Sequence, residues 1–217
     1  MIVVHGTGGI DNRTKYFADN LPKFGIAVFM VDFKTGVFTS PKDRLPGDDF
    51  QPFAFAALKT LRQNSNIDQN KIGIMGFSLG GNITLTSALM EYKSKWLGET
   101  QNGFKVHVAY YPGCKFFLRK IKSNSQIQAP LKVYWGTKDS YGDGEYCPKL
   151  KNELSEISKN PVELESFEGG HHGFDGLRTI SYYDPAAINT NGYSEANSDF
   201  ANKARQSSIE FIIKYLK

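Results

Sequence analysis

The sequence contains no apolar run of the roughly 18 residues that a membrane-spanning helix requires. Its first residue, Met1, leads directly into an apolar strand pattern and does not begin a signal peptide, which predicts a cytoplasmic protein by default. Basic residues outnumber acidic ones only 26 to 22, and the lysines are scattered. Nucleic-acid-binding proteins usually carry a dense basic stripe with interleaved aromatic residues. We therefore expect neither a membrane nor a nucleic acid as a partner.

Cysteine is scarce, with Cys114 and Cys147 as the only two. They form neither a metal-binding cluster nor a C-x-x-C redox motif, so the sequence predicts no metal site. It also has no internal repeat and no low-complexity linker. Because 40% of its 217 residues are hydrophobic, the chain can bury a substantial core. These features predict a single domain over residues 1–217.

Short apolar segments alternate with helical patterns along the chain. The predicted strands cover residues 2–5, 26–32, 71–75, 106–111, 131–135 and 162–167, and the predicted helices cover residues 14–24, 48–61, 79–92, 148–158 and 198–216. Several strands are almost continuously apolar, which is typical of a parallel sheet covered on both faces by helices. The pattern therefore predicts an α/β fold. The segment 175–197 is expected to be a long irregular loop that serves function or acts as a lid.

A serine, Ser78, lies between glycines in the segment Gly76–Gly81. A strand pattern precedes this segment and a helix pattern follows it. In such a G-x-S-x-G turn, the strained backbone exposes the serine hydroxyl above the sheet, where it acts as a nucleophile. The alternative is a glycine-rich helix start with Ser78 as an ordinary N-cap. The strand and helix on either side favour the nucleophile.

A serine nucleophile needs a histidine base, and the base needs a carboxylate to orient it. Asp139 follows the predicted strand 131–135, at the strand end where ligand sites of α/β sheets gather, and Asp143 is the second choice. The alternative for Asp139 is a turn aspartate. His171 and His172 lie on a glycine-rich loop after the last predicted strand, and spacing alone does not choose between them. The order Ser, Asp, His is that of α/β-hydrolases.

The glycine-rich segment His5–Gly9 follows the first predicted strand. Acyl transfer requires backbone N–H groups that stabilise an oxyanion. We expect one donor from Leu79, directly after the serine, and a second from Thr7, with Gly8 as the next choice. The segment does not match the glycine spacing of phosphate-binding loops.

Together these segments resemble the dienelactone hydrolase-like family of α/β-hydrolases. The resemblance rests on residues 3–6, 75–81, 110–113, 136–139 and 170–174. It implies the α/β-hydrolase fold, with a mainly parallel sheet of about six strands because the usual N-terminal strands are absent. It also selects His172, since the catalytic histidine of the family directly precedes a small residue and a phenylalanine. Ser78, Asp139, Thr7 and Leu79 are supported in the roles given above.

The chain departs from this family in its nucleophile and its arginines. Founding members use cysteine where this chain has Ser78, and a serine hydroxyl depends more on its base because it does not ionise as a thiol does. Those members also bind the lactone carboxylate with arginines. Here Arg178 is near His172 in sequence but is not aligned with a family arginine. The departures favour general ester hydrolysis over hydrolysis of dienelactone.

Cys114 and Cys147 follow two strands that should be neighbours in the sheet, and each leaves the sheet at the same end. A disulfide is possible if their Cα atoms come within about 7 Å, and the sequence leaves this open. A disulfide would indicate a periplasmic or secreted protein instead of a cytoplasmic one.

We therefore predict a serine hydrolase that cleaves a small ester or lactone without a cofactor. The alternatives are a thioesterase or peptidase with the same triad, and a non-catalytic binding protein. Substrate contacts are expected from Tyr111 and Tyr141, with Phe38 and either Tyr182 or Tyr183 as further candidates. Ordinary packing of these aromatic side chains is the alternative.

Overall fold

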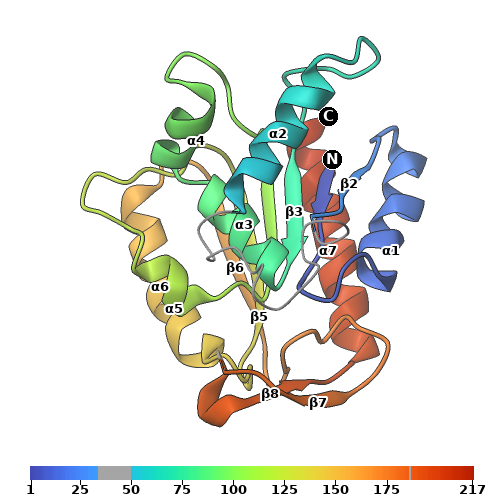
Figure 1. The fold of residues 1–217 in the computed structure, drawn as a ribbon, viewed down its shortest axis with the longest axis vertical. Coiled ribbons are helices and arrows are strands. Elements are labelled where there is room, and N and C mark those ends of the chain that lie inside the picture. Colours follow the sequence, from blue (N-terminus) through green and yellow to red (C-terminus); the bar gives the residue numbers. More distant parts are fainter. Residues whose placement is uncertain (34–49, 186) are drawn as a thin grey trace.

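The computed structural model describes residues 1–33, 50–185 and 187–217 of the chain. Its main feature is a parallel six-stranded sheet in the order β2-β1-β3-β4-β5-β6 (Figure 1). The strands are β1 (Ile2–Val4), β2 (Phe29–Val31), β3 (Ile74–Phe77), β4 (His107–Tyr110), β5 (Leu131–Gly136) and β6 (Val162–Phe167). This sheet confirms the predicted α/β class and the predicted number of about six strands.

One face of the sheet is covered by α1 (Asn12–Asn20), the short 3-10 helix η1 (Leu21–Phe24) and α7 (Ser198–Leu216). Val3 and Met75 are register partners and point to this side, where they share a core with Ile212 of α7. The side of α7 that faces the sheet is apolar, with Ala204, Phe211 and Ile212 buried in this core. None of the described helices combines the length and the apolar character needed to cross a membrane.

The opposite face carries the remaining helices (Figure 1). These are α2 (Gln51–Arg62), α3 (Leu79–Ser87), α4 (Met90–Leu97), α5 (Cys114–Leu118) and α6 (Asp143–Ile157). Because side chains alternate across a strand, Ile2 and Ile74 point to this side and pack with Leu58 of α2 and Ile83 of α3. Helices on both faces leave the carboxyl ends of the parallel strands open for a site.

The helix predicted over residues 79–92 is two helices, α3 and α4, which are separated at Leu89. Leu89 has an extended backbone and forms an antiparallel bridge with Ile127. The next residue, Met90, donates its backbone N–H to the carbonyl of Gln126. Pairing with a distant segment therefore overrides the local helical pattern. The first two residues of the helix predicted from Asp48 lie outside the described residues.

The segment 175–197 was expected to be irregular, and this prediction is wrong. It contains an antiparallel hairpin of β7 (Ile180–Tyr183) and β8 (Asn191–Ser194), with the 3-10 helix η3 (Ile188–Thr190) before β8. The hairpin lies beyond one end of the main sheet, at the bottom of Figure 1. Ile180, Tyr182 and Tyr183 are β-branched or aromatic and suit a strand.

Candidate active site

Ser78 occupies the turn between β3 and α3 and has a φ of 54°. A side-chain-bearing residue is strained in this conformation. The turn closes because its neighbours are glycines. A Cβ atom on Gly76 would lie 2.1 Å from the carbonyl oxygen of Gly80, and one on Gly80 would lie 2.2 Å from that of Val4. The structure therefore has the strained strand-to-helix turn predicted from the motif.

His172 lies on the loop after β6 and joins two of the predicted site residues. Its Nε2 atom is 2.9 Å from Ser78 Oγ, and its Nδ1 atom is 2.8 Å from Asp139 Oδ2. The neighbouring His171 is directed elsewhere, with Nε2 3.7 Å from Glu195 Oε2 and its ring against Tyr193. Of the two histidines that the sequence left open, His172 is thus the one beside Ser78.

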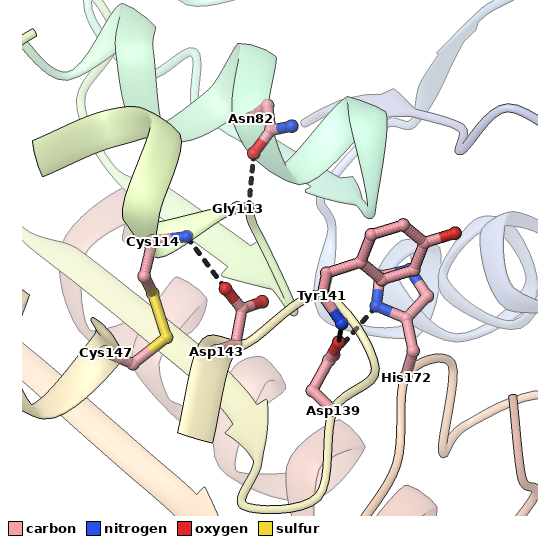
Figure 2. Close-up of a disulfide and its surroundings, with 8 residues drawn as sticks. All are labelled: Asn82, Gly113, Cys114, Asp139, Tyr141, Asp143, Cys147 and His172. Atoms are coloured by element: carbon pink, nitrogen blue, oxygen red, sulfur yellow. Dashed lines mark hydrogen bonds and ion pairs between the residues drawn. A yellow bond between two sulfur atoms is a disulfide. The ribbon is translucent and has the colours of Figure 1, made fainter. Parts of the chain in front are cut away.

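Asp139 follows β5, and its side chain is completely shielded from solvent. Its second carboxyl oxygen, Oδ1, accepts a hydrogen bond of 2.8 Å from the backbone N–H of Tyr141 (Figure 2). The carboxylate is therefore held from two sides, and its Oδ2 atom is directed at His172. Such an arrangement fixes the orientation of an imidazole.

Asp143, the second-choice acid, is the first residue of α6 and bonds to Cys114 instead of His172 (Figure 2). It is fully buried, and its Oδ1 atom accepts a hydrogen bond of 2.9 Å from the backbone N–H of Cys114. Burial, and secondarily the nearby charge of Asp139, raises the pKa of the Asp143 carboxyl well above its ordinary value. Asp143 therefore anchors the loop that carries Asp139.

Cys114 and Cys147 form a disulfide with an S–S distance of 1.97 Å and a Cα–Cα distance of 5.1 Å. The bond joins the first residue of α5 to α6, on the side of Asp143 away from His172 (Figure 2). These three residues are the one group of clustered potential metal ligands in the part of the chain that the structure describes. Because both sulfur atoms are used in the disulfide, only the Asp143 carboxyl is left to offer a metal.

The predicted oxyanion donors lie on two segments that meet at Ser78. Leu79 is the first residue of α3, where N–H groups have no partner within the helix. Thr7 is exposed on the loop after β1. This loop approaches the serine closely, since a Cβ atom on its Gly6 would lie 3.4 Å from Ser78 Cβ. His5 bonds the same loop through Nδ1, 2.6 Å from the carbonyl oxygen of Gly6.

The predicted substrate-contacting tyrosines both pack against His172. The ring centroids of Tyr111 and Tyr141 lie 4.7 and 4.6 Å from that of His172. Tyr111 is fully buried with a φ of 36°, and its hydroxyl donates to Asp175 Oδ1 over 2.6 Å. Arg13 in turn donates to the Tyr111 hydroxyl over 3.3 Å. Phe38 lies outside the described residues.

Two sets of residues around His172 were missed by the sequence analysis. One is the pair Arg13 and Asp175, whose side chains bond to the hydroxyl of Tyr111. The other is the hairpin segment, where Ser194 donates its hydroxyl hydrogen to the carbonyl of His172 over 2.7 Å. The fold of residues 175–197 was not predicted, so nothing in the sequence indicated that Ser194 would lie there.

A six-stranded parallel sheet with a serine at a strained strand-to-helix turn defines an α/β-hydrolase fold. The model of the dienelactone hydrolase family matches residues 1–210, and the chain belongs to this family.

A curated relative and several solved structures resemble the chain. The chain is 26% identical over 157 residues to the carboxymethylenebutenolidase of Rhodococcus opacus, a match covering 69% of this chain and 52% of that protein. The chain thus spans about half the length of this relative. Esterase 2 of Thermogutta terrifontis phosphorylated by paraoxon superposes with a TM-score of 0.67 at 16% identity, covering 98% of this chain and 81% of the esterase. Its propionate-bound form gives a TM-score of 0.65 at 16% identity, covering 98% and 82%. At these identities, the structural likeness shows the fold alone.

Proposed function

We propose that the chain is a carboxylic ester hydrolase that cleaves a small ester or lactone, with Ser78 as nucleophile, His172 as general base and Asp139 as the acid that orients it. The observation that carries the proposal is the position of His172, whose two ring nitrogens are 2.9 Å from Ser78 Oγ and 2.8 Å from Asp139 Oδ2. Membership of the dienelactone hydrolase family supports the same reaction class. The names carboxymethylenebutenolidase and esterase of the similar proteins also agree with it.

The first half of the reaction forms an acyl-enzyme. His172 Nε2 removes the hydroxyl proton as Ser78 Oγ attacks the carbonyl carbon of the ester. The negative charge that develops on the carbonyl oxygen is stabilised by the backbone N–H groups of Leu79 and Thr7. Asp139 stabilises the imidazolium that results. Collapse of the tetrahedral intermediate breaks the bond to the alcohol oxygen, which receives the proton from His172.

The second half releases the acid. His172 removes a proton from a water molecule, which attacks the carbonyl carbon of the acyl-enzyme. A second tetrahedral intermediate collapses, and Ser78 Oγ takes the proton back. With a lactone as substrate, the alcohol group stays attached to the acyl chain, and the product is a hydroxy acid.

The proposal is tested by replacing Ser78 with alanine. The variant should lose hydrolysis of p-nitrophenyl acetate, and a fluorophosphonate probe should label Ser78 of the native protein, as located by peptide mass spectrometry. Ser181→Ala is the matched control, because Ser181 lies on the exposed hairpin and bonds to Asn191. Full turnover by a folded Ser78→Ala protein would contradict the proposal. A native protein that neither reacts with the probe nor hydrolyses esters would instead favour a binding protein.

A further inference from the structure

The β7–β8 hairpin is hydrogen-bonded both to the loop that carries Asp139 and to His172. Ile188 donates its backbone N–H to the carbonyl of Ser140 over 2.8 Å. The hydroxyl of Ser140 accepts from the backbone N–H of Tyr193 over 3.1 Å and lies 3.3 Å from the carbonyl of the same residue. Ser194 bonds the carbonyl of His172. The hairpin therefore has a fixed place beside the candidate site, as a preorganised binding surface requires.

Tyr141 connects the hairpin to the reacting groups. Its ring lies against His172, at 4.6 Å between centroids (Figure 2). Its hydroxyl donates to Asp184 Oδ2 over 2.7 Å and lies 3.0 Å from the hydroxyl of Tyr182 on β7. The polar atoms of the two tyrosines thus bond to each other and to Asp184, so their rings are held at neighbouring positions.

Tyr182 lies flat on the second strand of the hairpin. Its register partner on β8 is Gly192, and a Cβ atom there would lie 2.5 Å from Tyr182 Cε2. Glycine at this position lets one side of the ring pack onto the strand backbone. The side chain is nevertheless 36% exposed. Ile180, two residues earlier on the same side of β7, is 46% exposed.

We propose that Tyr141, Tyr182 and Ile180 form a wall that binds a flat apolar group of the ester, above all an aromatic ring. Apolar side chains that stay exposed beside a reacting centre mark a binding surface, and tyrosine rings bind flat groups by stacking or edge contacts. A sugar or an anionic group would need free hydrogen-bond donors, whereas the hydroxyl hydrogens of both tyrosines are already used, that of Tyr141 to Asp184 and that of Tyr182 to Tyr141. This inference rests on the proposed hydrolysis and specifies its substrate class.

The test compares esters that differ only in a ring. Ethyl acetate and 2-naphthylmethyl acetate share the acetyl group and release primary alcohols, and ethyl 2-naphthylacetate carries the ring on the acyl side. Tyr182→Ala should lower kcat/KM for at least one naphthyl ester relative to ethyl acetate by about tenfold, mainly through KM. The ester that is affected shows whether the wall binds the alcohol or the acyl part. Tyr182→Phe keeps the ring and should retain most of the preference.

The sequence left Tyr182 and Tyr183 as alternatives, and because side chains alternate along β7, Tyr183 points to the side opposite Tyr182. Tyr183→Ala is therefore the matched control. It should leave the ratio unchanged. A second experiment measures binding without hydrolysis. The affinity for each naphthyl ester is measured by calorimetry in the Ser78→Ala variant and in the double variant Ser78→Ala/Tyr182→Ala. An affinity about tenfold weaker supports the wall even if the native protein hydrolyses no ester, in which case the proposed function alone fails. Unchanged ratios and affinities, or an equal fall of kcat/KM for all three esters, would overturn the wall while the hydrolase assignment stands.

Discussion

The hydroxyl of Ser194 donates a hydrogen bond of 2.7 Å to the backbone carbonyl of His172. The two residues also form a parallel bridge, and the backbone N–H of Glu195 donates to the same carbonyl over 3.3 Å. The fit is close, because a Cβ atom on Gly173 would lie 2.3 Å from Ser194 Oγ. The loop of the proposed base is therefore held by the β7–β8 hairpin, outside the main sheet.

Replacing Ser194 with alanine should loosen this loop. We expect the free energy of unfolding to fall by about 1 kcal/mol, and kcat for p-nitrophenyl acetate to fall about three- to tenfold because the imidazole is less well placed. Urea denaturation and steady-state kinetics measure the two effects. Ser181→Ala, on the exposed strand of the same hairpin, is the control and should change neither. An unaltered kcat in Ser194→Ala would show that the bond does not position His172.

The hydroxyl of Tyr111 should contribute to stability more than to substrate binding. Tyr111→Phe removes the hydrogen-bond donor of Asp175 Oδ1, and Asp175 is fully buried. Leaving a buried carboxyl without this partner should cost about 1–3 kcal/mol of unfolding free energy. Because phenylalanine keeps the ring against His172, we expect an unchanged KM for p-nitrophenyl acetate.

The matched control for this prediction is Tyr110→Phe. Tyr110 is equally buried, but its hydroxyl bonds to Ser208 instead of Asp175. Both variants should be less stable in urea. A KM raised only in Tyr111→Phe would support the hypothesis from sequence that Tyr111 contacts the substrate.

The elements with a clear local pattern were predictable from sequence. Strand β6 and helix α7 have the predicted bounds, Val162–Phe167 and Ser198–Leu216. Proline and glycine flank the strand, and Asn197 caps the helix by accepting from two of its N–H groups. The break at Leu89 was not predictable, because it depends on pairing with the distant Ile127. The β7–β8 hairpin pairs segments that are close in sequence, but its second strand reads Asn-Gly-Tyr-Ser, and asparagine and glycine are depleted in strands.

The candidate site likewise contains residues whose position the sequence predicted and residues whose position it did not. Ser78, Asp139 and His172 each follow a strand of the sheet, so the motif and the chain order sufficed to bring them together, and their catalytic roles stay predictions. No sequence motif indicates the hydrogen bonds that join Tyr111 to Arg13 and Asp175 beside His172. Tyr111 is 98 positions from Arg13 and 64 from Asp175. Contacts at this separation form only after the sheet has brought the segments together, and no local motif records them.

The disulfide should stabilise the protein mainly through the loop that it closes. Cys114 and Cys147 are 33 positions apart, which corresponds to about 3–4 kcal/mol in the chain-entropy estimate. Reduction should lower the free energy of unfolding in urea by that amount. The double variant Cys114→Ala/Cys147→Ala should match the reduced protein and show no response to the reductant. Two free thiols in the untreated protein, found by thiol titration, would contradict this prediction.

Asp143 should make stability depend on pH in a direction set by its burial. The pKa of this carboxyl is raised above its ordinary value of 3.8 by burial, and secondarily by the charge of Asp139. In the unfolded chain Asp143 loses its proton near pH 4, whereas the folded protein retains it to higher pH. Its contribution to stability is therefore complete below about pH 4 and is lost as the pH rises towards the folded-state pKa, by about 1.4 kcal/mol per unit.

Asp143→Asn removes this titration and keeps an oxygen that accepts from the N–H of Cys114. We expect the variant to be about as stable as the native protein at pH 4 and more stable at pH 7, by at least about 1 kcal/mol. Urea denaturation at both pH values measures the difference, and the titrating groups that do not interact with Asp143 cancel because both proteins contain them. Asp143→Ala is the control and should be less stable at both pH values, since Cys114 loses its acceptor. An asparagine variant that matches the native protein at pH 4 but is less stable at pH 7 would show that Asp143 is ionised in the folded protein. The carboxylate would then need a positively charged partner, but among the described residues Asp143 forms no ion pair, its Oδ2 atom has no hydrogen-bond partner, and the nearby Asp139 has the same charge.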